Sequence, residues 1–252
     1  MHEPEAAVAF HRAGSDDGPL VPQYELCARG MSKLLAREGT VLDLGSGSGR
    51  YLAYLARRRP DAQILGVELS QSMLDLGEQM LAAEQLADRV RLVQGDMTDC
   101  SQLVPERLDL LSCMLALHQL PSAVELAGAL RQIAAIRADT GCALWISDIV
   151  RLEDDTVMQE WMSLAPDVDP AFRRDALASE AAGWTQSELT QALEEADLGA
   201  LHHCYSPLLQ VHWAPAADSA QRESDEDWQD VAISKDVRRR VMALRLGLAG
   251  LP

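Results

Sequence analysis

Long apolar runs and paired cysteines are both absent from this sequence. No segment approaches the roughly 20 apolar residues that a membrane-spanning helix needs, although 48% of the 252 residues are hydrophobic. The five cysteines form no C-x-x-C pair of the kind that zinc sites and redox motifs use. The first ten residues, MHEPEAAVAF, carry acids where a signal peptide would carry basic residues. We therefore expect a soluble, cytoplasmic protein with reduced thiols and no membrane contact.

Basic residues are scarce. The chain has 22 lysines and arginines against 39 acidic residues, a formal net charge of -17. Such a charge repels the phosphate backbone that nucleic-acid-binding proteins attract, so nucleic acid is excluded as an expected partner. The acidity also keeps a protein soluble, which is explanation enough for it. The length suits one large α/β domain or a domain with a small appendage.

Short apolar runs alternate with longer amphipathic stretches from residue 39 onward. This alternation is typical of strands and crossover helices that build a mainly parallel sheet. The runs that we predict as strands are Thr40–Leu44, Gln63–Val67, Arg91–Gln94, Leu108–Cys113 and Ala143–Ile149. Apolar residues spaced three and four apart predict helices over Arg50–Arg59, Gln71–Gln85 and Ser122–Ala138. The stretch 103–107 is too short for a confident helix and is expected to be a loop or a single turn.

The second half of the chain continues the pattern with one helix and a pair of strands. Thr185 with Glu188 three residues later matches a capping box, which predicts a helix within 184–196. Ala200–Cys204 and Leu208–Trp213 are predicted strands. The short connection between them is too brief for a parallel return, so this pair must be antiparallel.

Three segments lie outside the predicted core and define the expected domains. Residues 1–38 form an N-terminal helical cap that includes a helix over Gln23–Arg37. Residues 39–213 form the main domain, with residues 151–183 as a long acidic lid insertion after the fifth strand. Loops of that length in compact domains are usually functional. Residues 214–252 form a C-terminal extension that begins acidic and ends amphipathic.

A glycine-rich turn, Asp43-Leu44-Gly45-Ser46-Gly47-Ser48-Gly49, follows the first predicted strand and opens a helix. The three glycines remove side chains that would block a ligand from the backbone. Glu68 ends the second strand, where a carboxylate suits ribose hydroxyls. The dinucleotide pattern G-x-G-x-x-G needs glycine or alanine at position 50, and this chain has Arg50 there. The turn therefore disfavours a dehydrogenase.

Gly95-Asp96-Met97 ends the third predicted strand beside the first two sites. Asp96 can accept a hydrogen bond from an exocyclic adenine amine, and the Met97 thioether suits a ring face. Carboxylates at strand ends also serve simply as caps. Three of them together with the glycine turn favour a cofactor site.

In these motifs the chain resembles the class I S-adenosylmethionine-dependent methyltransferases of the small-molecule type. VLDLGSGSGR, ILGVELSQSMLDLGEQ, VRLVQGDM and LALHQLPS carry the resemblance, which covers roughly residues 39–213. It implies an α/β, doubly wound, Rossmann-like fold whose seven-stranded, mostly parallel sheet has an antiparallel last strand, here with a helical lid. It implies S-adenosyl-L-methionine as the cofactor. The cofactor-binding residues that it implies are Asp43, Gly45, Ser46, Gly47, Gly49, Glu68, Leu69, Asp96, Met97 and Cys113.

Catalytic candidates are fewer. Methyl transfer is an in-line displacement that depends mainly on alignment and on the exclusion of water. His118 follows the fourth strand and is the best-placed general base, although a structural role is compatible with the same position. Tyr24 is a second candidate, because a tyrosine in the N-terminal helix of similar enzymes can fold over the cofactor. Helix packing is the alternative for Tyr24.

The substrate pocket is assigned to Met114, Trp161 and Trp184. Met114 and Gln119 stand where related enzymes often have asparagine and histidine, which leaves the acceptor open. Aromatic residues among carboxylates in the insertion, Phe172 included, suit a nitrogen-bearing or cationic acceptor, or they simply anchor the loop. No metal site is expected, because His202 and His203 point to opposite faces of a strand and Asp148 has no matching ligands nearby.

The expected function is therefore transfer of a methyl group from S-adenosylmethionine to a nitrogen or oxygen atom of a small-molecule acceptor. A non-catalytic S-adenosylmethionine-binding regulatory protein is the alternative, motivated by Met114. A nucleotide-dependent oxidoreductase is disfavoured because no Y-x-x-x-K pattern is present. The signatures of nucleic-acid methyltransferases are also missing. The sequence is compatible with a homodimer.

Overall fold

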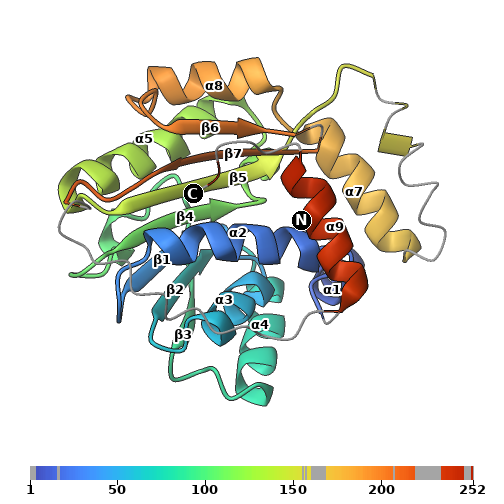
Figure 1. The fold of residues 1–252 in the computed structure, drawn as a ribbon, viewed down its shortest axis with the longest axis horizontal. Helices are drawn as coiled ribbons and strands as arrows, with labels where there is room; N and C mark the ends of the chain where they lie inside the picture. The colour runs from blue at the N-terminus through green and yellow to red at the C-terminus, as the bar shows by residue number, and fades with distance from the viewer. Residues whose placement is uncertain are drawn as a thin grey trace.

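A seven-stranded sheet forms the centre of the protein in a computed structural model (Figure 1). The structure describes residues 4–15, 18–154, 156, 158–159, 169–206, 208–218, 234–246 and 251. The strands are β1 (Thr40–Leu44), β2 (Gln63–Glu68), β3 (Val90–Gln94), β4 (Leu110–Met114), β5 (Ala143–Ile149), β6 (His202–Tyr205) and β7 (Leu209–Ala214). Their order across the sheet is β3-β2-β1-β4-β5-β7-β6.

The pairing of the strands confirms the predicted fold class. β1 to β5 are parallel, and β7 runs antiparallel to both β5 and β6. The bounds of β1 and β5 agree with the prediction, and those of the other strands differ by one or two residues. The order reverses between β1 and β4, and ligands bind at such a point in open α/β sheets.

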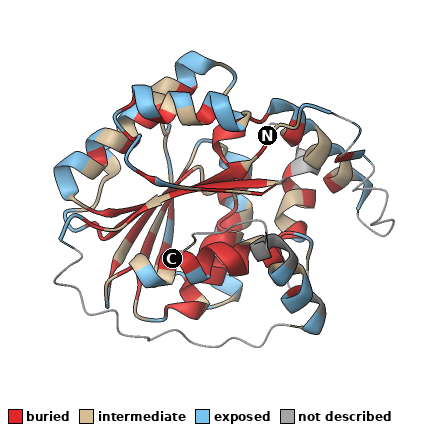
Figure 2. Ribbon diagram, turned by 45° about the horizontal axis from the view of Figure 1, so that its top comes forward, coloured by how far each residue is buried: buried red, intermediate tan, exposed pale blue. Residues whose placement is uncertain are grey.

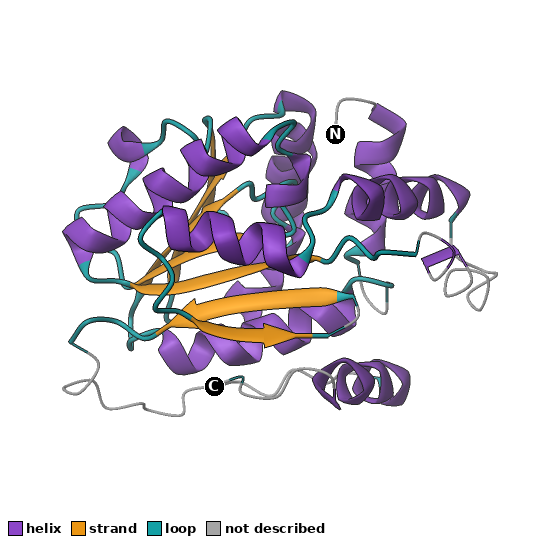
Figure 3. Cartoon of the chain, turned by 90° about the horizontal axis from the view of Figure 1, so that it is seen from above, coloured by secondary structure: helices purple, strands orange, loops and turns teal. Residues whose placement is uncertain are grey.

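Helices cover both faces of this sheet (Figure 3). They are α1 (Pro4–Ala13), α2 (Val21–Leu34), α3 (Arg50–Arg58), α4 (Gln71–Ala83), α5 (Ala123–Thr140), α7 (Pro170–Ala182), α8 (Gln186–Glu195) and α9 (Lys235–Leu246), with short 3-10 turns η1 (Ser101–Leu103) and η2 (Leu117–Gln119). α2, α3 and α4 pack on one face around a first core cluster that includes Met31, Leu52 and Leu74. α5 and α8 pack on the other face around a second core cluster that includes Leu130 and Leu193.

Burial on both faces explains why the strands are apolar throughout instead of alternating (Figure 2). In β5, Trp145 enters the first core cluster while its neighbours Leu144 and Ile146 enter the second. Trp145 lies directly against Gly30 of α2, where an added Cβ would come within 2.3 Å of the indole ring. Only glycine lets α2 approach the sheet this closely.

The local signals for helix ends agree with the structure. The capping box is present before α8, because Thr185 Oγ1 accepts from the amide of Glu188 and the Glu188 carboxylate accepts from the amide of Thr185. The Ser122 hydroxyl likewise accepts from backbone amides at the start of α5. The predicted helix over 23–37 instead begins at Val21, since Pro22 suits the first helical turn. Between β3 and β4 the chain forms only η1 and a loop, as expected for so short a crossover.

The segments outside the core gather at one end of the molecule. α1, α7 and α9 lie together at the right-hand side of the view in Figure 1. α1 packs against α7 and α4, and α9 packs along α2. No helix among the described residues is long and apolar enough to cross a membrane.

Candidate functional site

The glycine-rich turn lies where β1 ends, beside the point at which the strand order reverses. Gly45, Gly47 and Gly49 have φ values of 74°, 56° and 68°, the left-handed region that favours glycine. A Cβ on Gly45 would lie 2.4 Å from the Cβ of Ala116 and 2.8 Å from Cε of Met97. The turn therefore packs against two neighbouring strand ends, and glycine is required at its first position by conformation and by space.

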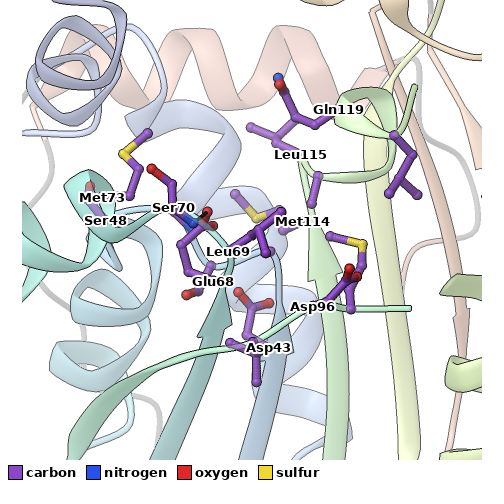
Figure 4. A pocket seen from close by; sticks show the side chains of 18 of the residues that line it. Asp43, Ser48, Glu68, Leu69, Ser70, Met73, Asp96, Met114, Leu115 and Gln119 are labelled. Carbon is purple, nitrogen blue, oxygen red and sulfur yellow. Dashed lines mark hydrogen bonds between the residues drawn. The ribbon is translucent and has the colours of Figure 1, made fainter. Parts of the chain in front are cut away.

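Glu68 at the end of β2 holds this turn in place. One carboxylate oxygen accepts from the amide of Gly47 at 2.8 Å, and the other accepts from the amide of Ser70 at 2.8 Å. Each carboxylate oxygen can accept more than one hydrogen bond. Glu68 thus shapes the turn and still has acceptor capacity toward the cavity, where its carboxyl group lies near those of Asp43 and Asp96 (Figure 4).

Asp96 and Met97 lie at the end of β3. One oxygen of Asp96 accepts from the amide of Thr98 at 2.8 Å and from its hydroxyl at 2.7 Å, which fixes the carboxylate at the rim. The other oxygen accepts no hydrogen bond from the described residues. Met97 reaches back toward Gly45. The pair therefore offers an oriented acceptor and a soft apolar surface side by side.

Asp43 is the most deeply buried of the three carboxylates, with 2% of its surface exposed. The hydroxyl of Ser112 on β4 donates to it at 2.5 Å. Burial raises the pKa of Asp43 to about 7, and the nearby charge of Glu68 adds to the rise while the Ser112 hydrogen bond opposes it. A cation placed against Asp43 would favour its ionised form.

These residues line a cavity of about 680 Å³, within the range of pockets that enclose drug-sized ligands, ~300–1,000 Å³. Figure 4 shows Leu115 and Gln119 on the far side from Asp43. The structure brings most of the predicted site residues to this cavity. They are Tyr24, Asp43, Gly45, Ser46, Gly47, Glu68, Leu69, Asp96, Met97, Met114 and His118.

Three predicted residues do not line the cavity, and a fourth lies outside the described residues. Cys113 points into the second core cluster, because successive side chains of a strand face opposite sides and Met114 takes the cavity side. Gly49 starts α3 and faces Leu92. Trp184 lies against the second core cluster. Trp161 falls outside the described residues.

The aromatic residues of the insertion also take a different place from the one expected. Phe172 is buried in the first core cluster, and the indole of Trp184 donates to a backbone carbonyl of η2. Neither ring faces the cavity. The aromatic surface predicted for a cationic acceptor is therefore not formed by these two residues, which anchor the insertion to the core instead.

His118 in η2 lines the far side of the cavity and is tied to Asp148 at the end of β5. Nδ1 of His118 lies 2.6 Å from one oxygen of Asp148, and the backbone amide of His118 donates to the other at 3.0 Å. A carboxylate can only accept, so the ring carries its proton on Nδ1. The side-chain nitrogen of Gln119 lies 2.7 Å from Nε2 and can only donate, so Nε2 accepts this hydrogen bond and the ring is neutral. Asp148 thus orients the histidine.

Tyr24 also lines the cavity, packed between the rings of Tyr51 and Tyr54 with centroid distances of 5.5 and 6.3 Å. Burial raises the pKa of its phenol far above the ordinary value. Tyr24 therefore stays protonated at neutral pH, which suits a hydrogen-bond donor and excludes a general base.

Sequence reasoning missed the contribution of α1. Phe10 lines the cavity next to Gly47, and Nδ1 of His11 lies 2.8 Å from the hydroxyl of Ser48. A guanidinium nitrogen of Arg50 lies 3.0 Å from Nε2 of His11 and can only donate, so His11 is neutral. Burial and the charge of Arg50 lower the pKa of His11 to about 4. No local motif marks these residues, because they reach the turn only through packing of the whole helix.

Among the described residues, no group of three or more histidine, cysteine, aspartate or glutamate side chains is placed to hold one metal ion. All five cysteines are buried and unpaired.

Comparisons with known proteins agree with this geometry. Residues 41–141 match the model of a methyltransferase domain family. A curated relative, release factor glutamine methyltransferase from Rhodopirellula baltica, is 33% identical over 92 residues, which cover 33% of this chain and 31% of the relative. The chain thus spans about a third of the length of that relative.

Solved structures share the fold at low sequence identity. An O-methyltransferase family protein from Burkholderia thailandensis matches with a TM-score of 0.57 and 20% identity, over 79% of this chain and 57% of that one. The O-methyltransferase NcsB1 of neocarzinostatin biosynthesis, solved with S-adenosyl-L-homocysteine and 1,4-dihydroxy-2-naphthoic acid, matches with a TM-score of 0.53 and 19% identity over 79% of this chain and 56% of that one.

Strand order and cavity position define a Rossmann-like protein of the methyltransferase type, with the antiparallel β7 inserted between β5 and β6. The sequence of residues 41–141 agrees with this class, because it matches a methyltransferase domain family. Residues 41–141 are thus similar to a methyltransferase domain family, and the sheet has the strand order of the methyltransferase Rossmann-like fold.

Proposed function

We propose that this protein transfers a methyl group from S-adenosylmethionine to a hydroxyl oxygen of a small-molecule acceptor. The observation that carries the proposal is the pair formed by His118 and Asp148, in which Nδ1 of a histidine that lines the cavity is held 2.6 Å from a carboxylate oxygen. Methyl transfer from the cofactor is the activity of the family. The choice of a hydroxyl acceptor rests on the histidine.

The residues of the cavity fit S-adenosylmethionine. At Gly47 the nearest atom to an added Cβ is Cε1 of Phe10 at 3.9 Å, which leaves the backbone of the turn open to close approach of the methionine part. Glu68 has acceptor capacity for ribose hydroxyls, and the second oxygen of Asp96 suits the adenine amine. Asp43 suits a positively charged group. When bound, the cofactor supplies an electrophilic methyl group attached to a positively charged sulfur.

The chain's own part in the chemistry lies at His118. An alcohol or phenol is a weak nucleophile until its proton is removed, and a neutral imidazole is a suitable base near neutral pH. An acceptor hydroxyl that replaces the Gln119 amide at Nε2 of His118 gives its proton to that nitrogen. The Asp148 carboxylate stabilises the imidazolium that forms through its 2.6 Å hydrogen bond. An amine acceptor needs such a base less once it is neutral, so the pair favours oxygen.

The acceptor side of the cavity is mostly apolar, with Met114, Leu115, Leu120 and Pro121 beside Phe10. Such a surface suits a small, flat organic molecule held by shape. The 1,4-dihydroxy-2-naphthoic acid in the NcsB1 complex is a molecule of this kind, bound to a protein of the same fold.

We propose the domain arrangement on the same basis. Residues 1–38 act as a cap, residues 39–213 as the catalytic domain and residues 214–252 as an extension. The packing of α1 against α7 supports a lid formed by the N-terminal cap together with residues 151–183. A closed lid would exclude water and hold the acceptor in line.

A screen for S-adenosylhomocysteine formation tests the proposal. Phenols, naphthols and hydroxylated naphthoic acids are compared with amines of the same ring systems, with the wild-type protein and labelled cofactor. We expect the label on oxygen. Label only on nitrogen would contradict the assignment of the acceptor atom. Tight cofactor binding without any transfer would favour a non-catalytic binding protein, the alternative that Met114 at the cavity wall motivates.

A further inference from the structure

Trp184 follows α7 closely, at the start of the turn that leads into α8. It pairs with Val150 in an isolated bridge at the end of β5, so its backbone extends the sheet by one residue. Its indole N–H donates to the carbonyl of Leu117 at 3.0 Å. A side chain beside the insertion thus bonds the loop that carries His118 while facing away from the cavity.

The hydrogen bond from Trp184 is accepted by the peptide group that joins Leu117 to His118. The carbonyl of Leu117 and the amide of His118 belong to the same planar unit. Trp184 holds the carbonyl at 3.0 Å, and Asp148 holds the amide at 3.0 Å. With both ends of the plane held, the peptide group from which the Cα of His118 extends keeps its orientation.

The support behind Trp184 comes from β7. The side-chain nitrogen of Gln210 donates to the carbonyl of Trp184 at 3.0 Å and to that of Ile149 at 3.2 Å. Gln210 is fully buried and pairs with Asp148 in the register of β5 and β7. One antiparallel pair of strands therefore positions both partners of the Leu117–His118 peptide group.

We propose that Trp184 is a positioning residue for His118, which sets the angle at which the imidazole meets the acceptor. This inference rests on the proposed function of His118 as the base. A base must reach its proton within hydrogen-bond distance, and a displacement of about 1 Å can cost on the order of 100-fold in rate. Trp184 acts through the backbone of η2 and touches neither ligand.

The variant that tests this is Trp184→Phe, which keeps an aromatic ring on the second core cluster and removes only the donor. We expect kcat to fall about 10- to 100-fold while the acceptor KM and the cofactor affinity stay within about twofold. Trp213→Phe is the matched control, because the Trp213 indole stacks on His202 in β6 and takes no part in this loop. Thermal unfolding checks that both variants fold.

Two further readouts separate positioning from mere packing. In a double-mutant cycle with His118→Ala, Trp184→Phe should cause no additional loss of kcat, because its effect passes through the histidine. In proton NMR of the free protein, the signal of the His118 Nδ1 proton bonded to Asp148 should shift or broaden in Trp184→Phe and stay unchanged in Trp213→Phe.

The outcomes distinguish the two proposals. Full kcat in His118→Ala would overturn the base itself and the proposed function with it. Loss of kcat in His118→Ala, with wild-type kcat and an unchanged Nδ1 signal in Trp184→Phe, would overturn the positioning role alone. Additive losses in the double variant would likewise contradict action through His118.

Discussion

The two sides of the cavity are built in different ways. The cofactor side comes from three consecutive strand ends and the turns that follow them, within residues 43–98. The side proposed for the acceptor combines η2 with the end of β4, and Asp148 of β5, Trp184 and β7 support it from behind. The first side is local in sequence, whereas the second exists only after long-range packing.

This difference separates two kinds of contribution. On the cofactor side, the backbone conformation of the glycine turn and the carboxylates that hold it decide what binds. On the acceptor side, a single histidine is placed by Asp148 and by the peptide group that precedes it. Changes on one side should therefore alter cofactor affinity, and changes on the other should alter turnover.

The largest expected effect is that of His118→Ala. Loss of the general base should lower kcat by about 10²–10⁴-fold, since this is the usual contribution of a positioned base. Calorimetry should show nearly unchanged affinity for S-adenosylhomocysteine. His202→Ala, which changes an exposed histidine on β6, serves as the control. A His118→Ala variant that loses cofactor affinity as strongly as turnover would contradict the claim that the two sides of the cavity contribute separately to turnover and to cofactor binding.

Gly45→Ala should have the strongest effect on the cofactor side. Its positive φ and the 2.4 Å approach to Ala116 force strain on the turn, which costs on the order of 1–3 kcal/mol or about 5- to 150-fold in affinity. Gly141→Ala carries the same backbone strain at the end of α5, where the nearest side-chain atom lies at 3.5 Å. The control should lose stability and keep cofactor affinity, and equal affinities in both variants would contradict the role of the turn.

Glu68→Gln should weaken cofactor binding by roughly 1.5–3 kcal/mol, because ribose hydroxyls lose a charged acceptor. Glutamine is preferred to alanine, since it keeps an acceptor for the Gly47 amide and so preserves part of the turn. Glu78→Gln on the exposed side of α4 controls for the change of charge. Unchanged affinity by calorimetry would exclude the assigned contact.

Asp43 gives an effect of another kind, visible as a pH dependence of stability. Its folded-state pKa is raised from 3.8 to about 7, so between these values the folded protein holds a proton that the unfolded chain has lost. The free energy of unfolding should therefore fall as pH rises from about 4 to about 7, by at most about 1.4 kcal/mol per pH unit from this group. Asp43→Asn should lose this slope in chemical denaturation without cofactor, and identical slopes would refute the assignment.

Much of the fold was predictable because its signals are local. Apolar runs covered on both faces indicated the strands, and the Thr185–Glu188 pair indicated the start of α8. The glycine turn, Glu68 and Asp96 were expected at one site for the same reason, and the structure brings them to one cavity. Each of these signals depends on residues a few positions apart.

The acceptor side could not be predicted to the same depth. His118 was a candidate from its position after β4, but its partner Asp148 comes from another strand, 30 residues later in the chain. Trp184 was assigned to the pocket because it is aromatic and lies near the insertion, whereas the bridge to Val150 turns it toward η2. On the other side of the cavity, the contact of His11 with Ser48 in the glycine turn was missed for the same reason, because it forms only when α1 packs on the turn. Such contacts depend on tertiary structure, which short sequence motifs do not predict.

A crystal structure with S-adenosylhomocysteine tests the central claim most directly. The account predicts adenine beside Asp96 and Met97, ribose hydroxyls on Glu68 and the sulfur directed toward His118. A ligand bound in the reverse direction, with adenine beside Met114 and His118, would contradict the division of the cavity into a cofactor side and an acceptor side.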